Sequence, residues 1–270
     1  MNNLRQELRE ILQQVAAKPQ KSWGQNFMVD QAVLEKIVRA AELTPDDVVL
    51  EIGAGTGFLT RELATRAGKV IALELERSMY HVLTHQLREF NNVDLLQEDG
   101  LEYQPGPGPY KLVANIPYQI TGRLIRYYLT EVANKPSRMV LLMQKEVAQK
   151  AIAEAPDANL FSMSILPFAI TEYVATVKRG SFYPVPKVDS AILLIDVLPE
   201  AKLKSDAEQY FRLLHICFQN KRKQLLNSLS GGLDLGKEQV AAMLEKVGID
   251  PKRRPQTLTL VEWDQLAGLQ

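Results

Sequence analysis

The chain has 270 residues, a length that suits one large and one small domain better than a single minimal one. Hydrophobic residues make up 46% and charged residues 24%, which argues against a chain that is disordered for most of its length. Because 32 basic residues balance 32 acidic ones, any affinity for nucleic acid has to come from local clusters of charge.

The chain is expected to open with an amphipathic helix, because apolar residues recur at helical spacing from Leu4 to Val15. The first residues are charged and lack the apolar stretch of a signal peptide. No later segment approaches the roughly 20 apolar residues that span a bilayer. These features predict a cytoplasmic protein without membrane association. A polar stretch containing KSWGQNF follows, and a second helix is expected over residues 30–42.

Between residues 48 and 180 short apolar runs alternate with amphipathic segments, which indicates βα units and a parallel sheet that is buried on both faces. Strands are expected at residues 48–52, 69–75, 93–97, 111–115 and 139–143, with helices at 58–67 and 78–90. Two further strands, 172–180 and 190–198, flank a connection rich in proline and aromatic residues. An antiparallel pair at the sheet edge would account for them.

From residue 205 onward the pattern predicts helices only. Capping boxes are expected where Ser205 precedes Glu208 and Thr259 precedes Glu262, and glycines 231, 232 and 248 are expected to separate helices. The only cysteine, Cys217, is expected in the core, and it excludes an internal disulfide. We therefore expect an α/β domain over residues 1–200, with a helical segment at 1–45, and an all-helical domain over 201–270.

A glycine-rich turn follows the first strand of the α/β region, and Glu74 lies about 20 residues beyond its first glycine, the spacing at which an acid meets ribose hydroxyls. A turn without a ligand is one alternative, and a nicotinamide site, which prefers G-x-G-x-x-G, is another. Residues 51–57 instead have the E-x-G-x-G-x-G pattern of nucleotide-fold methyltransferases. This pattern favours S-adenosylmethionine as the cofactor. Asp99, after the third strand, is either a turn residue or the partner of the cofactor's adenine.

The fourth strand runs into Asn115, Ile116, Pro117 and Tyr118. The amino nitrogen of adenine is a poor nucleophile, and two acceptors, the Asn115 side-chain oxygen and the Ile116 carbonyl, could draw it toward a tetrahedral form. Pro117 would fix the direction of that carbonyl, and Tyr118 could stack on an extracted base. An Asn-x-Pro turn without function is the alternative. A related tetrapeptide serves enzymes that methylate glutamine amides, so the motif alone does not establish adenine.

Four segments spread over nearly the whole chain resemble signatures of the ribosomal RNA adenine dimethyltransferases, in the branch that acts on the small subunit. The segments are KSWGQNF at 21–27, MQKEVA at 143–148, FYPVPKVDSA at 182–191 and RPQTLTL at 254–260. The resemblance implies a Rossmann-like methyltransferase sheet followed by a small helical domain. It also implies dimethylation of N6 of two adjacent adenosines near the 3′ end of small-subunit rRNA during ribosome biogenesis.

The resemblance further implies which residues contact the cofactor and the base. Phe182 would face Tyr118 across the flipped base, the alternative being a hydrophobic anchor for the edge hairpin. Gly100 stands where the family usually has alanine, and we expect it to loosen the loop after Asp99. Cofactor contacts carried over by motif are Asn26, Met28, Gly53, Gly55, Glu74, Asp99 and Asn115.

Two basic runs in the helical domain could grip RNA phosphates, although short runs of this kind are often only solvated surface. They comprise Lys221, Arg222 and Lys223, and Lys252, Arg253 and Arg254. The expected partner is small-subunit rRNA within a pre-ribosomal particle, bound by a monomer with no obligate protein partner. His81 and His85 stand one helical turn apart without further ligands, so no metal site is expected. The alternatives are a large-subunit rRNA methyltransferase of the resistance type and a non-catalytic assembly factor.

Overall fold

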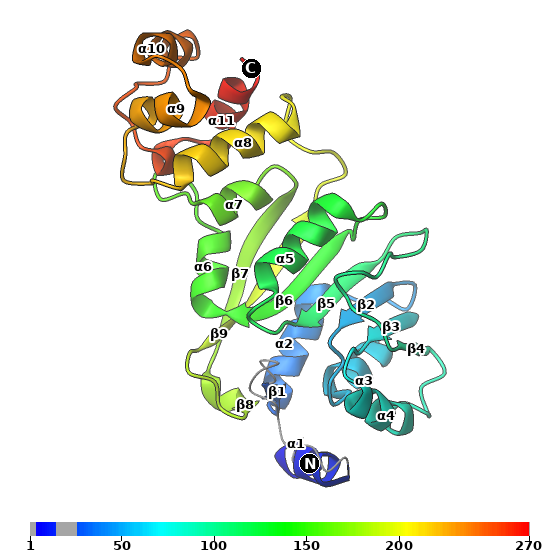
Figure 1. The fold of residues 1–270 in the computed structure, drawn as a ribbon. Coiled ribbons are helices and arrows are strands. Elements are labelled where there is room, and N and C mark those ends of the chain that lie inside the picture. Colours follow the sequence, from blue (N-terminus) through cyan, green and yellow to red (C-terminus); the bar gives the residue numbers. More distant parts are fainter. Residues whose placement is uncertain (1–3, 15–25, 270) are drawn as a thin grey trace. The chain divides into compact units, whose positions relative to one another are not determined.

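The computed structural model describes residues 4–14 and 26–269 (Figure 1). The chain divides into two compact units, the first made of Met1–Ala148 with Thr171–Val197 and the second of Gln149–Ile170 with Leu198–Gln270. Every helix in the described ranges is too short or too polar to cross a lipid bilayer.

One seven-stranded sheet with the strand order β4-β3-β2-β5-β6-β9-β7 forms the centre of the first unit. Strands β4, β3, β2, β5 and β6 are parallel to one another, whereas β9 runs antiparallel to β6, and β7 forms the edge. The predicted fold class is therefore confirmed. The strands are β2 (Val48–Ile52), β3 (Lys69–Leu73), β4 (Val93–Leu96), β5 (Lys111–Asn115), β6 (Arg138–Gln144), β7 (Ala169–Val177) and β9 (Ser190–Val197).

Helices cover the sheet, and in Figure 1 α5 lies in front of it and α2 behind it. The carboxylate of Asp30 caps α2 by accepting the N–H of Ala32 at 3.1 Å, which sets the start of the predicted second helix. Helix α5 continues into a π-helical turn, η2 (Tyr127–Glu131). The helices of this region are α1 (Leu4–Gln14), α2 (Gln31–Ala41), α3 (Phe58–Ala64), α4 (Arg77–Gln86), α5 (Thr121–Arg126) and α6 (Lys145–Ala151).

A second, two-stranded sheet joins the segment before α2 to the loop between β7 and β9. It pairs β1 (Phe27–Met28) antiparallel with β8 (Phe182–Tyr183), which follows the 3-10 turn η3 (Arg179–Ser181). The hydroxyl of Ser181 donates to the Asp30 carboxylate at 2.7 Å, and the Val29 N–H donates to the Ser181 carbonyl at 2.9 Å. The chain around residue 27 is thus held to the loop by four consecutive residues.

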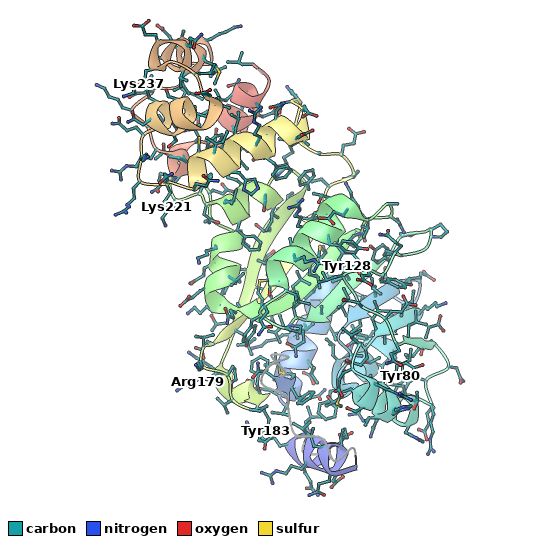
Figure 2. All side chains as sticks on the ribbon, in the orientation of Figure 1. Tyr80, Tyr128, Arg179, Tyr183, Lys221 and Lys237 are labelled. Carbon is teal, nitrogen blue, oxygen red and sulfur yellow. The ribbon has the colours of Figure 1, made fainter. Side chains whose placement is uncertain are left out.

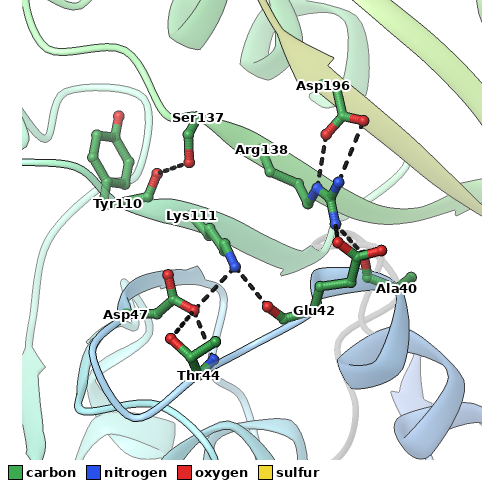
Figure 3. A network of polar contacts seen from close by, with 9 residues as sticks. All are labelled: Ala40, Glu42, Thr44, Asp47, Tyr110, Lys111, Ser137, Arg138 and Asp196. Carbon is green, nitrogen blue, oxygen red and sulfur yellow. Dashed lines mark hydrogen bonds and ion pairs between the residues drawn. The ribbon is translucent and has the colours of Figure 1, made fainter.

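Ion pairs close the end of the sheet at which β5 and β6 begin (Figure 3). Arg138, the first residue of β6, pairs with Asp196 at 2.7 Å and with Glu42 at 2.6 Å. Lys111, the first residue of β5, pairs with Asp47 at 3.0 Å and donates to the Glu42 carbonyl at 2.7 Å. Because these side chains bond to one another, the opposite end of the strands is the one left for a ligand.

The second unit is helical, and it includes residues 149–170 as well as the segment after β9. Ala158 and Met163 belong to the same buried cluster as Tyr210, whose hydroxyl donates to the Met163 carbonyl at 2.9 Å. The predicted single boundary near residue 200 therefore misses residues 149–170, which come earlier in the sequence but belong to the second unit. The helices here are α7 (Leu160–Ile165), α8 (Ala207–Phe218), α9 (Leu225–Leu233), α10 (Lys237–Lys246) and α11 (Leu260–Ala267), with the 3-10 turn η4 (Pro255–Thr257).

The capping box predicted at Ser205 is wrong. Asp206 caps α8 by accepting the N–H of Gln209 at 3.0 Å, and the Ser205 hydroxyl instead donates to Asp264 at 2.7 Å. The box that starts at Thr259 is confirmed. Cys217 is fully buried as expected, and burial raises the pKa of its thiol to about 12.

Gly231 and Gly232 were expected to separate two helices. They lie inside α9 instead, so this prediction is wrong. A Cβ on Gly232 would stand 2.2 Å from Cγ2 of Ile216 in α8, so this glycine lets the two helices approach closely. Gly248 follows α10 with φ +70° and ends it, in agreement with the prediction.

We expect Gly232→Ala to lower the free energy of unfolding by about 1–3 kcal/mol, because the new methyl group overlaps Ile216. Gly231→Ala is the matched control, since no described atom lies within 4 Å of a Cβ there. It should stabilise α9 by up to about 1 kcal/mol. Urea denaturation of both variants checks this, and equal effects at the two positions would contradict the packing role of Gly232.

Candidate active site

A cavity of about 320 Å³ opens where the central parallel strands end. The structure brings into its lining every predicted cofactor contact, together with the tetrapeptide that begins at the last residue of β5. The lining includes Asn26, Met28, Gly53, Gly55, Glu74, Asp99, Asn115, Ile116, Pro117 and Tyr118. Side chains far apart in the sequence are therefore available to one ligand.

Strand register explains why these residues meet. Ile52 pairs with Leu73 of β3 on one side and with Ala114 of β5 on the other. Gly53, Glu74 and Asn115 are the residues that come next, so they lie at the ends of three neighbouring strands. Neighbouring strands are about 4.8 Å apart, which spreads the three residues in a row across the sheet.

The glycine-rich turn after β2 needs its glycines. Gly53, Gly55 and Gly57 have φ values of +75°, +57° and +79°, a region that side chains with a Cβ avoid. The N–H groups of Gly53 and Ala54 both donate to the Leu73 carbonyl, at 2.9 and 3.0 Å. The turn is thus fastened to β3, and its backbone borders the cavity.

Glu74 lines the cavity, and its carboxyl group also accepts a hydrogen bond from the glycine-rich turn. One carboxylate oxygen accepts the N–H of Gly55 and the other accepts the N–H of Glu76, both at 2.8 Å. Burial raises the pKa of Glu74, although these two hydrogen bonds act in the opposite sense. Each oxygen keeps a lone pair, so the carboxylate can still accept hydrogen bonds from the hydroxyl groups of a ligand.

Glu51 is a buried carboxyl group beneath the turn, and it also lines the cavity. Its Oε2 has no hydrogen-bond partner among the described residues. Burial raises the pKa of Glu51 to about 8, so the group is mostly neutral at pH 7. A positively charged group in the cavity would favour its ionised form.

The side-chain amide of Asn115 is oriented by the segment before α2. Its Nδ2 donates to the Asn26 carbonyl at 3.3 Å, which leaves Oδ1 as a hydrogen-bond acceptor. The chain after it is fixed too, because the Ile116 N–H donates to the Leu142 carbonyl at 3.1 Å and the Ile120 N–H to the Pro117 carbonyl at 3.1 Å. Two acceptors of the kind predicted, Asn115 Oδ1 and the Ile116 carbonyl, therefore lie at the end of β5.

Tyr118 is held by a residue for which no role is predicted from the sequence. Its hydroxyl lies 2.9 Å from Oγ of Ser190, the fully buried first residue of β9. Burial raises the pKa of Tyr118, so its hydroxyl stays protonated and can share a hydrogen with Ser190. Ser190 lies within the FYPVPKVDSA segment, which was the only signal that could have pointed to it.

Phe182 does not line the cavity. Its side chain is 1% exposed and packs in the main hydrophobic core, and its backbone pairs with Met28. In this structure Phe182 is an anchor of β8, so a sandwich with Tyr118 would require its ring to turn out of the core.

The loop that carries Asp99 is pinned from below by tyrosines that sequence reasoning missed. The hydroxyl of Tyr128, which is fully buried, donates to the Gly100 carbonyl at 2.8 Å. Tyr127 in turn donates to the Tyr103 carbonyl at 3.1 Å. Both tyrosines lie in the π-helical turn η2, so this turn positions the loop.

Gly100 does not loosen this loop, contrary to the expectation from its sequence. A Cβ on Gly100 would stand 2.5 Å from Cγ2 of Ile52, so the loop packs directly on the last residue of β2. The Asp99 carboxylate accepts the N–H of Leu101 at 2.9 Å, and this bond fixes its direction at the cavity.

The two basic runs of the second unit lie next to each other. The Leu225 N–H donates to the Arg253 carbonyl at 2.8 Å and the Leu226 N–H to the Pro251 carbonyl at 3.2 Å. The Arg253 side chain is engaged internally, with Glu262 at 2.5 Å and with Thr257. It therefore orders the run instead of presenting a free cation. The exposed members are Lys221, Arg222, Lys223, Lys252 and Arg254.

Similarity to known proteins extends over nearly the whole chain. The family model described as ribosomal RNA adenine dimethylase matches residues 16–266. A ribosomal RNA small subunit methyltransferase A of Dehalococcoides mccartyi is 39% identical over 271 residues, covering 98% of this chain and 92% of the relative. The protein of the same name from Clostridium botulinum is 37% identical over 267 residues and 96% of each chain.

Two solved structures resemble the fold. A dimethyladenosine transferase from Plasmodium falciparum has a TM-score of 0.80 at 26% identity, with 89% of this chain and 95% of that chain covered. The 23S rRNA methyltransferase ErmE has a TM-score of 0.73 at 31% identity, with 90% and 98% covered. Because one of the two is a 23S rRNA methyltransferase, the fold alone does not assign this chain to small-subunit rRNA.

We expect Tyr128→Phe to weaken the binding of S-adenosylmethionine several-fold, because losing a buried hydrogen bond of about 1 kcal/mol frees the loop that carries Asp99. Tyr110→Phe is the matched control, since its buried hydroxyl donates to the Asn134 carbonyl at 2.9 Å. It should leave cofactor affinity unchanged. Isothermal titration calorimetry measures both, and equal weakening by the two variants would refute a specific role for Tyr128.

Proposed function

The chain belongs to the ribosomal RNA adenine dimethylase family, and we propose that it dimethylates N6 of two adjacent adenosines near the 3′ end of small-subunit rRNA with S-adenosylmethionine. The observation that carries the proposal is the row of Asp99, Glu74, Gly53 and Asn115 across four neighbouring strand ends. In this row the adenine, the ribose and the methionine part of the cofactor would meet Asp99, Glu74 and Gly53 in turn, and the target amine would meet Asn115.

The residues present fit this cofactor. The cavity of about 320 Å³ falls within the usual range for small-molecule sites, roughly 300–1,000 Å³. Glu74 offers oxygen acceptors to two hydroxyl groups. The carboxyl of Glu51, whose Oε2 has no hydrogen-bond partner among the described residues, offers a buried acid to a ligand that carries a sulfonium and an ammonium group. When bound, the cofactor supplies an electrophilic methyl group.

The protein's part in the reaction is to position the amine and to change its shape. Asn115 Oδ1 and the Ile116 carbonyl would accept hydrogen bonds from the two N–H groups of the adenine amine. These bonds would turn the nitrogen lone pair out of conjugation with the ring and toward the methyl group. The face of Tyr118, steadied through Ser190, would support the base outside its stack. The nitrogen loses its proton after transfer, so no general base is required before attack.

We further propose that the second unit recognises RNA while the first carries out the transfer. The exposed cations of residues 221–223, 252 and 254 lie on two segments joined by backbone hydrogen bonds, which suits phosphates brought together by a folded RNA. A neutral net charge supports a shaped ribonucleoprotein substrate, the pre-ribosomal particle, over bare RNA. The protein would act there as a cytoplasmic monomer. The names of the relatives favour the small over the large subunit.

The test mixes the protein with methyl-labelled S-adenosylmethionine and unmethylated small-subunit particles, then digests the RNA to nucleosides. We expect label in N6,N6-dimethyladenosine, and we expect Asn115→Ala to lower the rate by about 10²-fold or more, because an acceptor for the amine is lost. Cosedimentation with the particle should persist in this variant.

Two results would contradict the proposal. Label that appears only with large-subunit RNA would move the protein to the other substrate class. Absence of label from both RNAs, with cofactor binding intact, would favour an assembly factor that does not catalyse. Joint loss of methylation and particle binding in Asn115→Ala would refute the separation of the two roles.

A further inference from the structure

The short strand β8 exposes one aromatic side chain and buries the next. Tyr183 is 40% exposed, whereas its neighbour Phe182 is 1% exposed. Successive side chains of a strand point to opposite faces, so anchoring Phe182 in the core turns Tyr183 outward. Val185, two residues further on, is 56% exposed. A large ring and an aliphatic side chain therefore stand at the surface of this loop.

Tyr183 lies close to the proposed methyl acceptor site. Its backbone is the register partner of Phe27. Phe27 follows Asn26, whose carbonyl accepts the amide N–H of Asn115 at 3.3 Å. The backbone of Tyr183 is therefore about 5 Å, the spacing of two paired strands, from the segment whose Asn26 carbonyl orients the Asn115 amide.

Hydrogen bonds hold the loop in place on both sides of β8. Ser181 is bonded to Asp30 at 2.7 Å on one side of β8. On the other side the Asp189 carboxylate accepts the N–H of Arg179 at 3.0 Å and the ammonium group of Lys178 at 3.2 Å. Because the loop is held in advance, less conformational entropy is lost when the ring that it carries stacks on a partner.

The charge of this loop favours a nucleic acid as the partner. Residues 178–189 contain three cations, Lys178, Arg179 and Lys187, against the single carboxylate of Asp189. All three cations are exposed, and Asp189 is already hydrogen-bonded within the loop. Figure 2 shows Arg179 and Tyr183 on this part of the chain. Exposed aromatic rings flanked by cations are the surface that single-stranded nucleotides bind, through stacking and phosphate contacts.

We propose that Tyr183 stacks on the base next to the target adenosine, while Arg179 and Lys187 hold the phosphates on either side. This inference rests on the proposed function, and it assigns to Tyr183 a part in choosing which adenosine enters the site. Because the ring acts on the neighbouring nucleotide, its loss should weaken substrate binding and leave the transfer step intact.

The experiment measures KM and kcat for unmethylated small-subunit particles, together with the Kd for S-adenosylmethionine and the melting temperature. Tyr183→Ala should raise KM for the particle roughly 10-fold, the effect of losing one stacked base, with kcat, cofactor Kd and melting temperature unchanged. Tyr183→Phe keeps the ring and should stay within about twofold of the wild type. Val261→Ala truncates another exposed apolar side chain, 63% exposed on α11, and is the matched control.

An unchanged KM in Tyr183→Ala would overturn the inference, as would a Tyr183→Phe variant as weak as Tyr183→Ala, which would show that the hydroxyl matters and the ring does not. A loss of cofactor affinity or of melting temperature that accounts for the change would assign Tyr183 a structural role instead. Failure of the proposed function is distinguishable, because the wild-type protein itself would then not methylate the particle.

Discussion

Parallel pairing of β2 with β3 and β5 places the carboxyl ends of these strands side by side, and the site depends on that register. Ile52 lies beside both Leu73 and Ala114, so the residues that follow each of them become neighbours. A shift of one residue in either pair would move Glu74 or Asn115 away from the glycine turn and reverse the facing of its strand. The ion pairs of Arg138 and Lys111, at the opposite end of the strands, help to fix the position of β5 and β6.

The pairing of β1 with β8 links the cofactor side of the site to the acceptor side. Asn26 precedes β1 and orients Asn115, while Ser190, which follows the β8 loop, holds Tyr118. The β8 loop is therefore connected to the amide through β1 and to the aromatic ring proposed to contact the base through Ser190.

Local pattern predicted much of the fold and the site because the informative residues sit at the ends of strands. The expected strands 69–75 and 111–115 end at or next to Glu74 and Asn115, and Asp99 comes two residues after the expected strand 93–97. The contacts that could not be predicted join residues distant in the sequence, as Ser190 joins Tyr118 and as Gly232 meets Ile216. The role of Arg253 could not be predicted either, because it belongs to a basic run that suggests phosphate binding, whereas its side chain pairs with Glu262. The two-residue strands β1 and β8 could not be predicted because they are too short to show any periodicity.

The central claim is that four strand ends form one continuous site for the cofactor and the target amine. A crystal structure with S-adenosylhomocysteine bound would test it most directly. The account predicts the adenine beside Asp99, the ribose hydroxyls on Glu74, and the sulfur atom turned toward Asn115 between the glycine turn and Asn26. A ligand bound outside this cavity, or bound with its sulfur atom directed away from Asn115, would contradict it.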